Sequence, residues 1–233
     1  LLLHGGGVAG WMWEPLVWTL QPGRRLFVPD LPGHGRSADR PYVSHAETVR
    51  ELAALLRTGG NRQPAAVIGF SLGAQLAVLL AARWPELVSE AVIVSAQAQP
   101  LRLNRAVLSL LGLTAPLARR RWFARLQAKE LSIPAAMLED YIATSAGITR
   151  ETLLSSVSEN FGFELPEEWK QFPGRALVMA GARERKLMRD SAVTIHRALP
   201  GSELEIVEGC GHGIPLQKPA WFSERLADWL KAA

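Results

Sequence analysis

Short apolar runs alternate with longer amphipathic stretches along most of this chain. The runs predict buried strands over residues 1–3, 26–29, 65–68, 90–94, 175–180 and 203–207. The longer stretches repeat apolar residues at helical spacing and predict helices over residues 13–20, 44–56, 72–84, 190–199 and 219–230. Alternating strands and helices form a mostly parallel sheet with helices on both faces. The pattern therefore predicts the α/β class, with ligand chemistry at the carboxyl ends of the strands.

One long segment breaks this alternation. Between residues 97 and 171 no strand is predicted, and helices are expected near residues 101–111, 116–130, 134–145 and 149–160. An all-helical insertion after the carboxyl end of a strand is expected to lie over the site as a cap or lid. The predicted organisation is a core of residues 1–96 and 172–233 with a helical cap of residues 97–171.

Composition excludes several classes of protein. With 233 residues, 48% of them hydrophobic, the chain can bury one sizeable core. Its single cysteine, Cys210, excludes an internal disulfide and a multi-cysteine zinc site, and we expect a small buried hydrophobe there. The net charge is only +4, and the basic residues are interleaved with acidic ones, which argues against nucleic-acid binding. No apolar run approaches the roughly 18 residues of a membrane span and no signal peptide is in view, so we expect a cytoplasmic protein without a membrane partner.

The candidate chemistry centres on the pentapeptide Gly69–Gly73, which has Ser71 in the middle. Its glycines suit a turn too tight for β-carbons, which would project the Ser71 hydroxyl above the sheet. The start of the following helix supplies unpaired N–H groups and the positive end of a dipole, which favour a developing oxyanion. The alternative is an ordinary Gly-Ser turn, which can have the same Gly-x-Ser-x-Gly sequence. The apolar strand before it and the apolar helix after it favour a nucleophile elbow.

A serine hydroxyl is a poor nucleophile without a base, and His212 is the candidate base. It follows the last predicted strand on the glycine-rich loop of residues 208–213, which would hang over the sheet edge that Ser71 faces. The competing interpretation is that His212 only packs this loop. Of the other histidines we expect a structural role (His4), turn geometry (His34) and helix-face or surface positions (His45, His196).

The candidate acid is Glu184, the first carboxylate after the predicted strand of residues 175–180. It would hold the histidine in the correct tautomer and stabilise the imidazolium. The alternative is a solvated surface charge, because Arg183, Arg185 and Lys186 flank Glu184. Asp190 is the reserve candidate, although its place before a helical stretch is more typical of a helix N-cap.

An oxyanion hole needs two backbone donors. The N–H of Leu72 at the helix start is one candidate, and the N–H of Gly6, in the glycine loop after the first strand, is the other. The alternative for this loop is a plain flexible turn.

The predicted cap carries apolar side chains and a cluster of arginines. Apolar residues expected to line a substrate pocket, or else to be ordinary core, are Leu108, Leu111, Leu117, Trp122, Phe123 and Met137, with Phe70 beside the serine. The arginines are Arg102, Arg105, Arg119, Arg120, Arg121 and Arg125. They suit either a solvated helix face or a docking surface for an acidic acyl-carrier protein.

Four ordered motifs together resemble the α/β-hydrolase fold family. They are His4-Gly5-Gly6 with Trp13, the loop of residues 30–37, the pentapeptide at Ser71, and Gly211-His212 followed by Pro219. The similarity is to a small bacterial branch with pimeloyl-carrier-protein methyl esterases, other carboxylesterases, carbon–carbon hydrolases and the lyase of menaquinone synthesis. It spans nearly the whole chain except the predicted cap.

The resemblance implies a catalytic triad of Ser71, His212 and an acid at the position of Glu184, where most members have aspartate. It also implies a sheet without its first strands, since members carry about twenty further residues ahead of the His-Gly loop. The expected activity is hydrolysis of a small or acyl-chain ester through an acyl-enzyme, with no metal or cofactor. Alternatives are a carbon–carbon hydrolase, a menaquinone-type lyase, which has arginine where this chain has Gln75, and a signalling protein that binds a ligand with little turnover.

Overall fold

The computed structural model describes residues 1–59, 63–101 and 105–231. Its centre is a five-stranded sheet whose strand order equals the chain order. The strands are β1 (Leu2–Leu3), β2 (Ala65–Phe70), β3 (Val88–Val94), β4 (Arg175–Gly181) and β5 (Glu203–Val207). Every neighbouring pair is parallel. All five carboxyl ends therefore meet at one edge, as the sequence pattern predicts.

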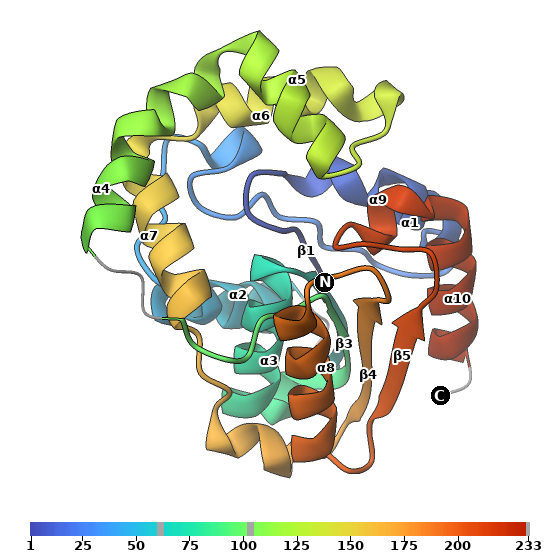
Figure 1. Cartoon of the computed structure of the whole chain (residues 1–233). Helices are drawn as coiled ribbons and strands as arrows, with labels where there is room; N and C mark the ends of the chain where they lie inside the picture. The colour runs from blue at the N-terminus through green and yellow to red at the C-terminus, as the bar shows by residue number, and fades with distance from the viewer. Residues whose placement is uncertain (60–62, 102–104, 232–233) are drawn as a thin grey trace.

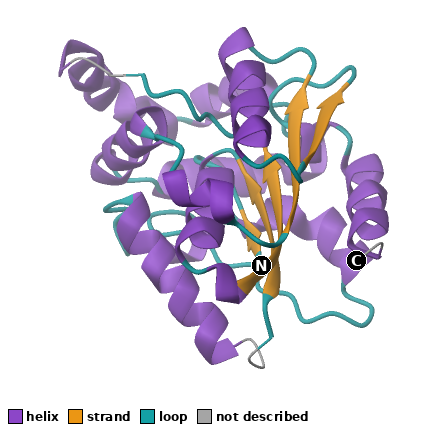
Figure 2. Ribbon diagram, turned by 90° about the horizontal axis from the view of Figure 1, so that it is seen from below, coloured by secondary structure: helices purple, strands orange, loops and turns teal. Residues whose placement is uncertain are grey.

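Two apolar layers cover the sheet because side chains alternate along each strand. In β3, Ala91 and Ile93 join one buried cluster, whereas Val92 and Val94 join the other. The first layer packs under α2 (His45–Gly59), α3 (Leu72–Arg83) and α8 (Lys186–Ala198). The second packs under α1 (Glu14–Leu20), the short α9 (Ile214–Gln217) and α10 (Pro219–Lys231). Figure 2 shows the strands between these helices.

Helices follow β3 at the carboxyl edge of the sheet. They are α4 (Arg105–Thr114), α5 (Arg121–Glu130), α6 (Leu138–Gly147) and α7 (Arg150–Gly162), with 3-10 turns η4 (Ala115–Arg119) and η5 (Ala135–Met137) between them and η6 (Glu167–Gln171) before β4. In Figure 1, α4, α5, α6 and the first part of α7 lie beyond the end toward which the strands point, whereas η6 lies at the other end, where β4 begins. The helices α4 to α7 are therefore placed over the predicted site. No helix in the described ranges has both the length and the apolar character that crossing a membrane requires.

Local signals fixed several helix ends as predicted. The Ser44 Oγ accepts a hydrogen bond from the Glu47 N–H at 3.1 Å, so Ser44 caps α2. The helix α3 ends at Arg83, directly before Trp84-Pro85. In the segment predicted as helix over residues 13–20, a 3-10 turn, η1 (Gly10–Trp13), precedes α1.

Two expectations are wrong. The run Leu26–Pro29 is not a strand, although Phe27 O accepts one hydrogen bond from Leu2 N at 2.8 Å. It lies beside a strand of only two residues, and Pro29 has no N–H to donate, so a ladder cannot extend. Asp190 is not an N-cap, because α8 begins four residues earlier and Asp190 pairs with Lys186 inside it at 2.5 Å.

Candidate active site

Ser71 occupies a strained turn between β2 and α3. Its φ of 53° and ψ of −115° are rare for a residue with a side chain. A β-carbon on Gly69 would lie 2.2 Å from the Gly73 carbonyl oxygen, and one on Gly73 would lie 2.2 Å from the Leu3 oxygen. Only glycine fits these two positions, while the Ser71 N–H is held by Val94 O at 2.9 Å. The turn therefore presents the Ser71 hydroxyl at the carboxyl edge of the sheet.

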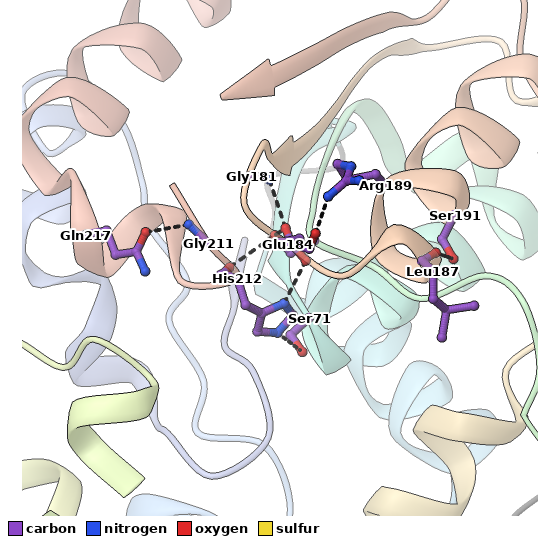
Figure 3. Close-up of polar contacts among 10 residues, drawn as sticks. Ser71, Gly181, Glu184, Leu187, Arg189, Ser191, Gly211, His212 and Gln217 are labelled. Atoms are coloured by element: carbon purple, nitrogen blue, oxygen red, sulfur yellow. Dashed lines mark hydrogen bonds and ion pairs between the residues drawn. The ribbon is translucent and has the colours of Figure 1, made fainter. Parts of the chain in front are cut away.

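His212 reaches this hydroxyl from the loop after β5. The Ser71 Oγ–H donates to His212 Nε2 at 3.0 Å, and the Nδ1–H of the same ring donates to Glu184 Oε2 at 3.1 Å (Figure 3). The Phe70 ring packs against the imidazole with centroids 5.1 Å apart. Three side chains far apart in the sequence therefore form one continuous hydrogen-bonded line.

Glu184 lies in the turn after β4 and is 5% exposed. Its second oxygen, Oε1, accepts from the Gly181 N–H at 2.9 Å and from the Ser95 hydroxyl at 2.6 Å. The side chain thus curls back toward Gly181, three residues earlier, which takes up the methylene that glutamate has beyond aspartate. The backbone oxygen of Glu184 accepts from the Arg189 guanidinium. The Lys186–Asp190 ion pair lies in α8 and does not join these contacts.

The surroundings of Glu184 keep its carboxylate ionised. Burial opposes the charge, but the hydrogen bond and charge of His212 and the hydrogen bonds from Ser95 and Gly181 outweigh it, so the pKa of Glu184 is lowered. A charged carboxylate at Nδ1 fixes the ring so that Nε2, facing Ser71, is the acceptor.

Ser95 was not identified from the sequence. It follows β3 directly, is fully buried, and has a φ of 55°. Its N–H donates to Met179 O at 2.8 Å, and its hydroxyl lies 3.1 Å from His212 O as well as 2.6 Å from Glu184. The sequence shows Ser95 as a polar residue immediately after a predicted strand. Its contact with Glu184 could be predicted only once β3 was known to pair with β4.

The two candidate oxyanion donors lie beside Ser71. Gly6 and Leu72 line the same cavity as Ser71. Within the described ranges neither of their N–H groups donates a hydrogen bond to another group. The Gly6 loop is pinned by buried His4, whose Nδ1–H donates to Gly5 O at 2.8 Å and whose Nε2 accepts from Leu31 N at 2.8 Å. His4 is structural, as predicted.

Asp30 ties the start of η1 to the loop of residues 30–37. Its carboxylate accepts from Gly10 N at 2.7 Å and from the Arg36 N–H and Nε–H at 2.9 Å each. Burial opposes its ionisation, but these contacts outweigh it and lower the pKa of Asp30. One charged group therefore holds the start of η1 against the loop that carries His34, a residue of the cavity wall beside Ser71.

A cavity of about 380 Å³ opens beside Ser71 under α4 to α7. Among the predicted pocket residues, Leu111 and Phe123 line it. Trp122 does not and is 62% exposed, so that prediction was wrong. Adjacent residues of a helix point about 100° apart, so Phe123 and Gln127 face the cavity while Trp122 faces outward.

The remaining predicted pocket residues lie elsewhere. Phe70 lines a second, small cavity on the His212 side of Ser71. Met137 packs against the apolar cluster on the α10 face, Leu117 is 38% exposed, and Leu108 is half-buried without lining the cavity. Met137, Leu117 and Leu108 thus lie on helices or turns of the insertion without lining the large cavity.

His45 lies on a face of α2, one of its two expected positions, but it is buried and not at the surface. It is 5% exposed because α7 covers the start of α2. Its Nε2 lies 2.9 Å from Gln75 Oε1 and its Nδ1 lies 2.8 Å from the Tyr42 hydroxyl. Gln75 in turn donates to the backbone oxygens of Gln97 and Asn160 at 2.8 and 3.0 Å. This network joins the core to both ends of the helical insertion.

His34 is buried and lines the large cavity, so it does more than shape a turn. His196 is a half-buried helix-face residue, and Cys210 is buried, as expected.

Arginines of the predicted cluster lie at the surface of the helical insertion. Arg119, Arg120, Arg121 and Arg125 are exposed, and Arg121 pairs with Glu139 at 2.8 Å. Arg102 and the Arg105 side chain lie outside the described residues. In the part of the chain that is described, no cluster of three or more His, Cys, Asp or Glu residues could hold a metal ion.

Comparison with known proteins places this geometry in a family. The sequence model of the Alpha/beta hydrolase family matches residues 1–225. A pimeloyl-[acyl-carrier protein] methyl ester esterase of Vibrio campbellii is 39% identical over 95 residues, which are 41% of this chain and 35% of that protein. The esterase Rv0045c of Mycobacterium tuberculosis is 28% identical over 237 residues, 94% of this chain and 78% of that protein.

A solved structure has the same fold. An esterase from Exiguobacterium antarcticum superimposes with a TM-score of 0.83 at 20% identity, over 99% of this chain and 90% of its own. At that identity the likeness establishes the fold alone. With the family match over 225 residues, the resemblance drawn from the sequence motifs is confirmed: the chain belongs to the alpha/beta hydrolase family.

Proposed function

We propose that the protein is a serine hydrolase that cleaves carboxylic esters through an acyl-enzyme. The observation that carries the proposal is the continuous line of hydrogen bonds from Ser71 through His212 to Glu184, at 3.0 and 3.1 Å. A hydroxyl, an imidazole and a charged carboxylate in this order are the parts that activate a serine. Esterases among the relatives support the same reaction.

In the proposed reaction, Ser71 Oγ attacks the ester carbonyl carbon while His212 Nε2 takes its proton. The carbonyl oxygen becomes an oxyanion that accepts hydrogen bonds from the N–H groups of Gly6 and Leu72. Nε2 then returns the proton to the alkoxy oxygen, the carbon–oxygen bond breaks, and the alcohol leaves. Water then attacks the acyl carbon and gives a proton to Nε2. Nε2 passes that proton to Ser71 Oγ as the carbon–Oγ bond breaks, which releases the acid and restores the Ser71 hydroxyl. Glu184 stays charged throughout and stabilises the imidazolium.

The proposal is tested by acid release from ethyl butanoate together with covalent labelling by a fluorophosphonate. We expect hydrolysis, and one label per chain on Ser71 by mass spectrometry. Ser71→Ala should lose both, whereas Ser158→Ala, which removes an exposed hydroxyl of α7, should keep both. Absence of both hydrolysis and labelling in the natural chain would reject the serine-hydrolase function and favour a ligand-binding signalling protein.

The lyase alternative is weakened by Gln75. That lyase has arginine at this position. Here the buried Gln75 amide forms hydrogen bonds with His45 and with two backbone oxygens, and it does not line the cavity. The carbon–carbon hydrolase alternative is tested by incubating the protein with a vinylogous diketone and with ethyl butanoate. Hydrolysis of the diketone without hydrolysis of the ester would favour the carbon–carbon hydrolase.

We also propose that carrier-bound acyl groups are among the substrates. Arg119, Arg120 and Arg125 are exposed on the helices that cover the cavity, and guanidinium groups suit an acidic carrier protein. Turnover of a carrier-bound ester should fall as salt rises, and more steeply than turnover of the free ester. Equal salt dependence of the two substrates would exclude docking at these arginines.

A further inference from the structure

Two cavities of very different size meet at Ser71. The large one has a volume of about 380 Å³ and the small one about 40 Å³. They share Gly6, Ser71 and Leu131 as lining residues. A substrate whose carbonyl carbon is at Ser71 and whose oxygen faces the Gly6 N–H must therefore place one side of the ester in each cavity.

The position of His212 decides which side goes where. His212 lines the small cavity and does not line the large one. The leaving alcohol takes its proton from His212 Nε2, so its oxygen must lie within hydrogen-bond reach of that nitrogen. The alcohol therefore lies on the side of the small cavity, and the acyl chain lies in the large one. The water that later attacks the acyl-enzyme needs the same place beside Nε2.

The small cavity limits the alcohol. The volume of about 40 Å³ is about a tenth of the 380 Å³ of the large cavity, so the small cavity suits a water molecule or a short alkoxy group and the longer side of the ester belongs in the large one. The walls of the small cavity include the buried side chains of Val8, Phe70 and Leu216, which are 2%, 5% and 4% exposed. Packed cores of this kind do not widen without strain.

The large cavity limits the charge of the acyl chain. Among the described residues, no Lys, Arg, Asp or Glu lines it. His34 does line it, but burial lowers the pKa of His34, so its ring is neutral. A carboxylate bound there would lose its water without gaining a cation, which is costly. The side-chain amides of Gln127 and Asn160 line the cavity without a partner among the described residues and suit a neutral polar group.

We propose that the protein is selective for esters of methanol or ethanol whose acyl chain is long and uncharged. This rests on the ester hydrolysis proposed above and adds the orientation of the substrate. The chain fits against Leu111, Leu153 and Val157, and the short alkoxy group fits beside His212.

The orientation is tested with two isomers, methyl octanoate and heptyl acetate, and the charge with monomethyl suberate. The isomers have the same atoms and differ only in which side of the ester is long. We expect kcat/KM for methyl octanoate to exceed that for heptyl acetate by at least about tenfold, as mismatched pockets commonly discriminate. Monomethyl suberate, which adds a carboxylate to the far end of the chain, should be at least about tenfold poorer than methyl octanoate.

Variants separate the two cavities. Val157→Phe narrows the large cavity and should lower kcat/KM for methyl octanoate more than for methyl butanoate, whereas Ser158→Phe adds the same ring outside it and should change neither. Leu216→Ala widens the small cavity and should raise the rate on butyl octanoate relative to methyl octanoate. If Leu216→Ala does not fold, the isomer comparison on the natural chain still decides the orientation.

Each outcome bears on a distinct proposal. Labelling of Ser71 with equal or faster hydrolysis of heptyl acetate would overturn the orientation and leave the serine-hydrolase function intact. Equal rates for methyl octanoate and monomethyl suberate would overturn the uncharged chain. Absence of labelling and of hydrolysis of every ester would overturn the proposed function and this selectivity with it.

Discussion

Ser95 is the residue whose position most affects the proposed acid. Its hydroxyl donates to a buried, charged oxygen of Glu184 at 2.6 Å. Hydrogen bonds to charged groups contribute about 1.5–3 kcal/mol. Ser95→Ala should therefore loosen Glu184 and lower kcat about 10- to 100-fold with KM nearly unchanged, because no ester contact is lost. Steady-state kinetics with methyl octanoate measures this.

A matched control for Ser95 exists in α10. Ser223 is also buried, but its hydroxyl has no partner among the described residues. Ser223→Ala should leave kcat unchanged and should not lower the unfolding midpoint. If Ser95→Ala had the same kinetics as Ser223→Ala, Ser95 would have no positioning role.

Glu184→Gln tests the acid itself. The amide keeps the shape but removes the charge and offers an N–H where an acceptor is needed, which disfavours the productive histidine tautomer. By analogy with the serine-protease triad, kcat should fall by about 10³- to 10⁴-fold. Asp190→Asn removes a carboxylate that is half-exposed in an ion pair with Lys186 and should change kcat less than twofold. A large loss in Asp190→Asn would move the acid role to Asp190.

At this scale the sequence was informative where a polar residue lies in the turn or loop after a strand. Ser71, Glu184 and His212 each come after an apolar run, and parallel strands bring such positions to one edge. Ser95 follows a run too, but its role depends on contact with a residue 89 positions away. His45 was misjudged because the helix that covers it, α7, comes more than a hundred residues later.

At the scale of elements, the elbow depends on two glycines with no room for a side chain. Gly73→Ala would place a β-carbon 2.2 Å from the Leu3 backbone oxygen, and neither backbone can yield without moving α3 or β1. We expect a loss of at least about 3 kcal/mol of unfolding free energy, or no soluble protein. Urea denaturation measures it.

Gly201→Ala is the control for this prediction. No atom of the described residues lies within 4 Å of a β-carbon placed on Gly201. The change should be neutral or slightly stabilising, because alanine restricts the unfolded chain. A Gly73→Ala variant as stable as Gly201→Ala would mean that the turn at Ser71 relaxes freely, contrary to its close contacts.

The positions of strands and helices along the chain were largely predictable, but the side of each helix of the insertion that faces the cavity was not. Five of the six predicted strands exist. The strands β1 to β4 are largely buried apolar runs, whereas β5, at the edge of the sheet, alternates polar and apolar residues and has only Val207 buried. The sixth, Leu26–Pro29, has a partner strand too short to pair with. Helices were expected across the insertion, but the sequence does not decide which side of α5 faces the sheet. Phe123 and Trp122 are both large and aromatic, and only the packing of α5 on α6 separates a cavity wall from an exposed ring.

For the whole molecule, three buried histidines make stability depend on pH. Burial, with the nearby His34, lowers the pKa of His4 to about 3, and burial also lowers the pKa values of His34 and His45. The hydrogen bonds of His4 require a neutral ring, since one nitrogen donates to Gly5 O and the other accepts from Leu31 N. Below pH 6.5 the unfolded chain binds protons that the folded chain does not, so the unfolding free energy falls.

Each such histidine contributes about 1.4 kcal/mol of lost stability per pH unit below 6.5, until its folded pKa is reached. Urea unfolding at pH 7.5 and pH 5.5 should therefore differ by about 1–4 kcal/mol, with the lower value at pH 5.5. The lowered pKa values of Asp30 and Glu184 delay their losses to more acidic pH, outside this window. His4→Asn should lower stability at both pH values and reduce the difference between them by about 1 kcal/mol. Equal stability of the natural chain at the two pH values would mean that these rings are solvated or charged in the folded state, and would contradict the tautomer assigned to His4 and with it the support of the Gly6 loop.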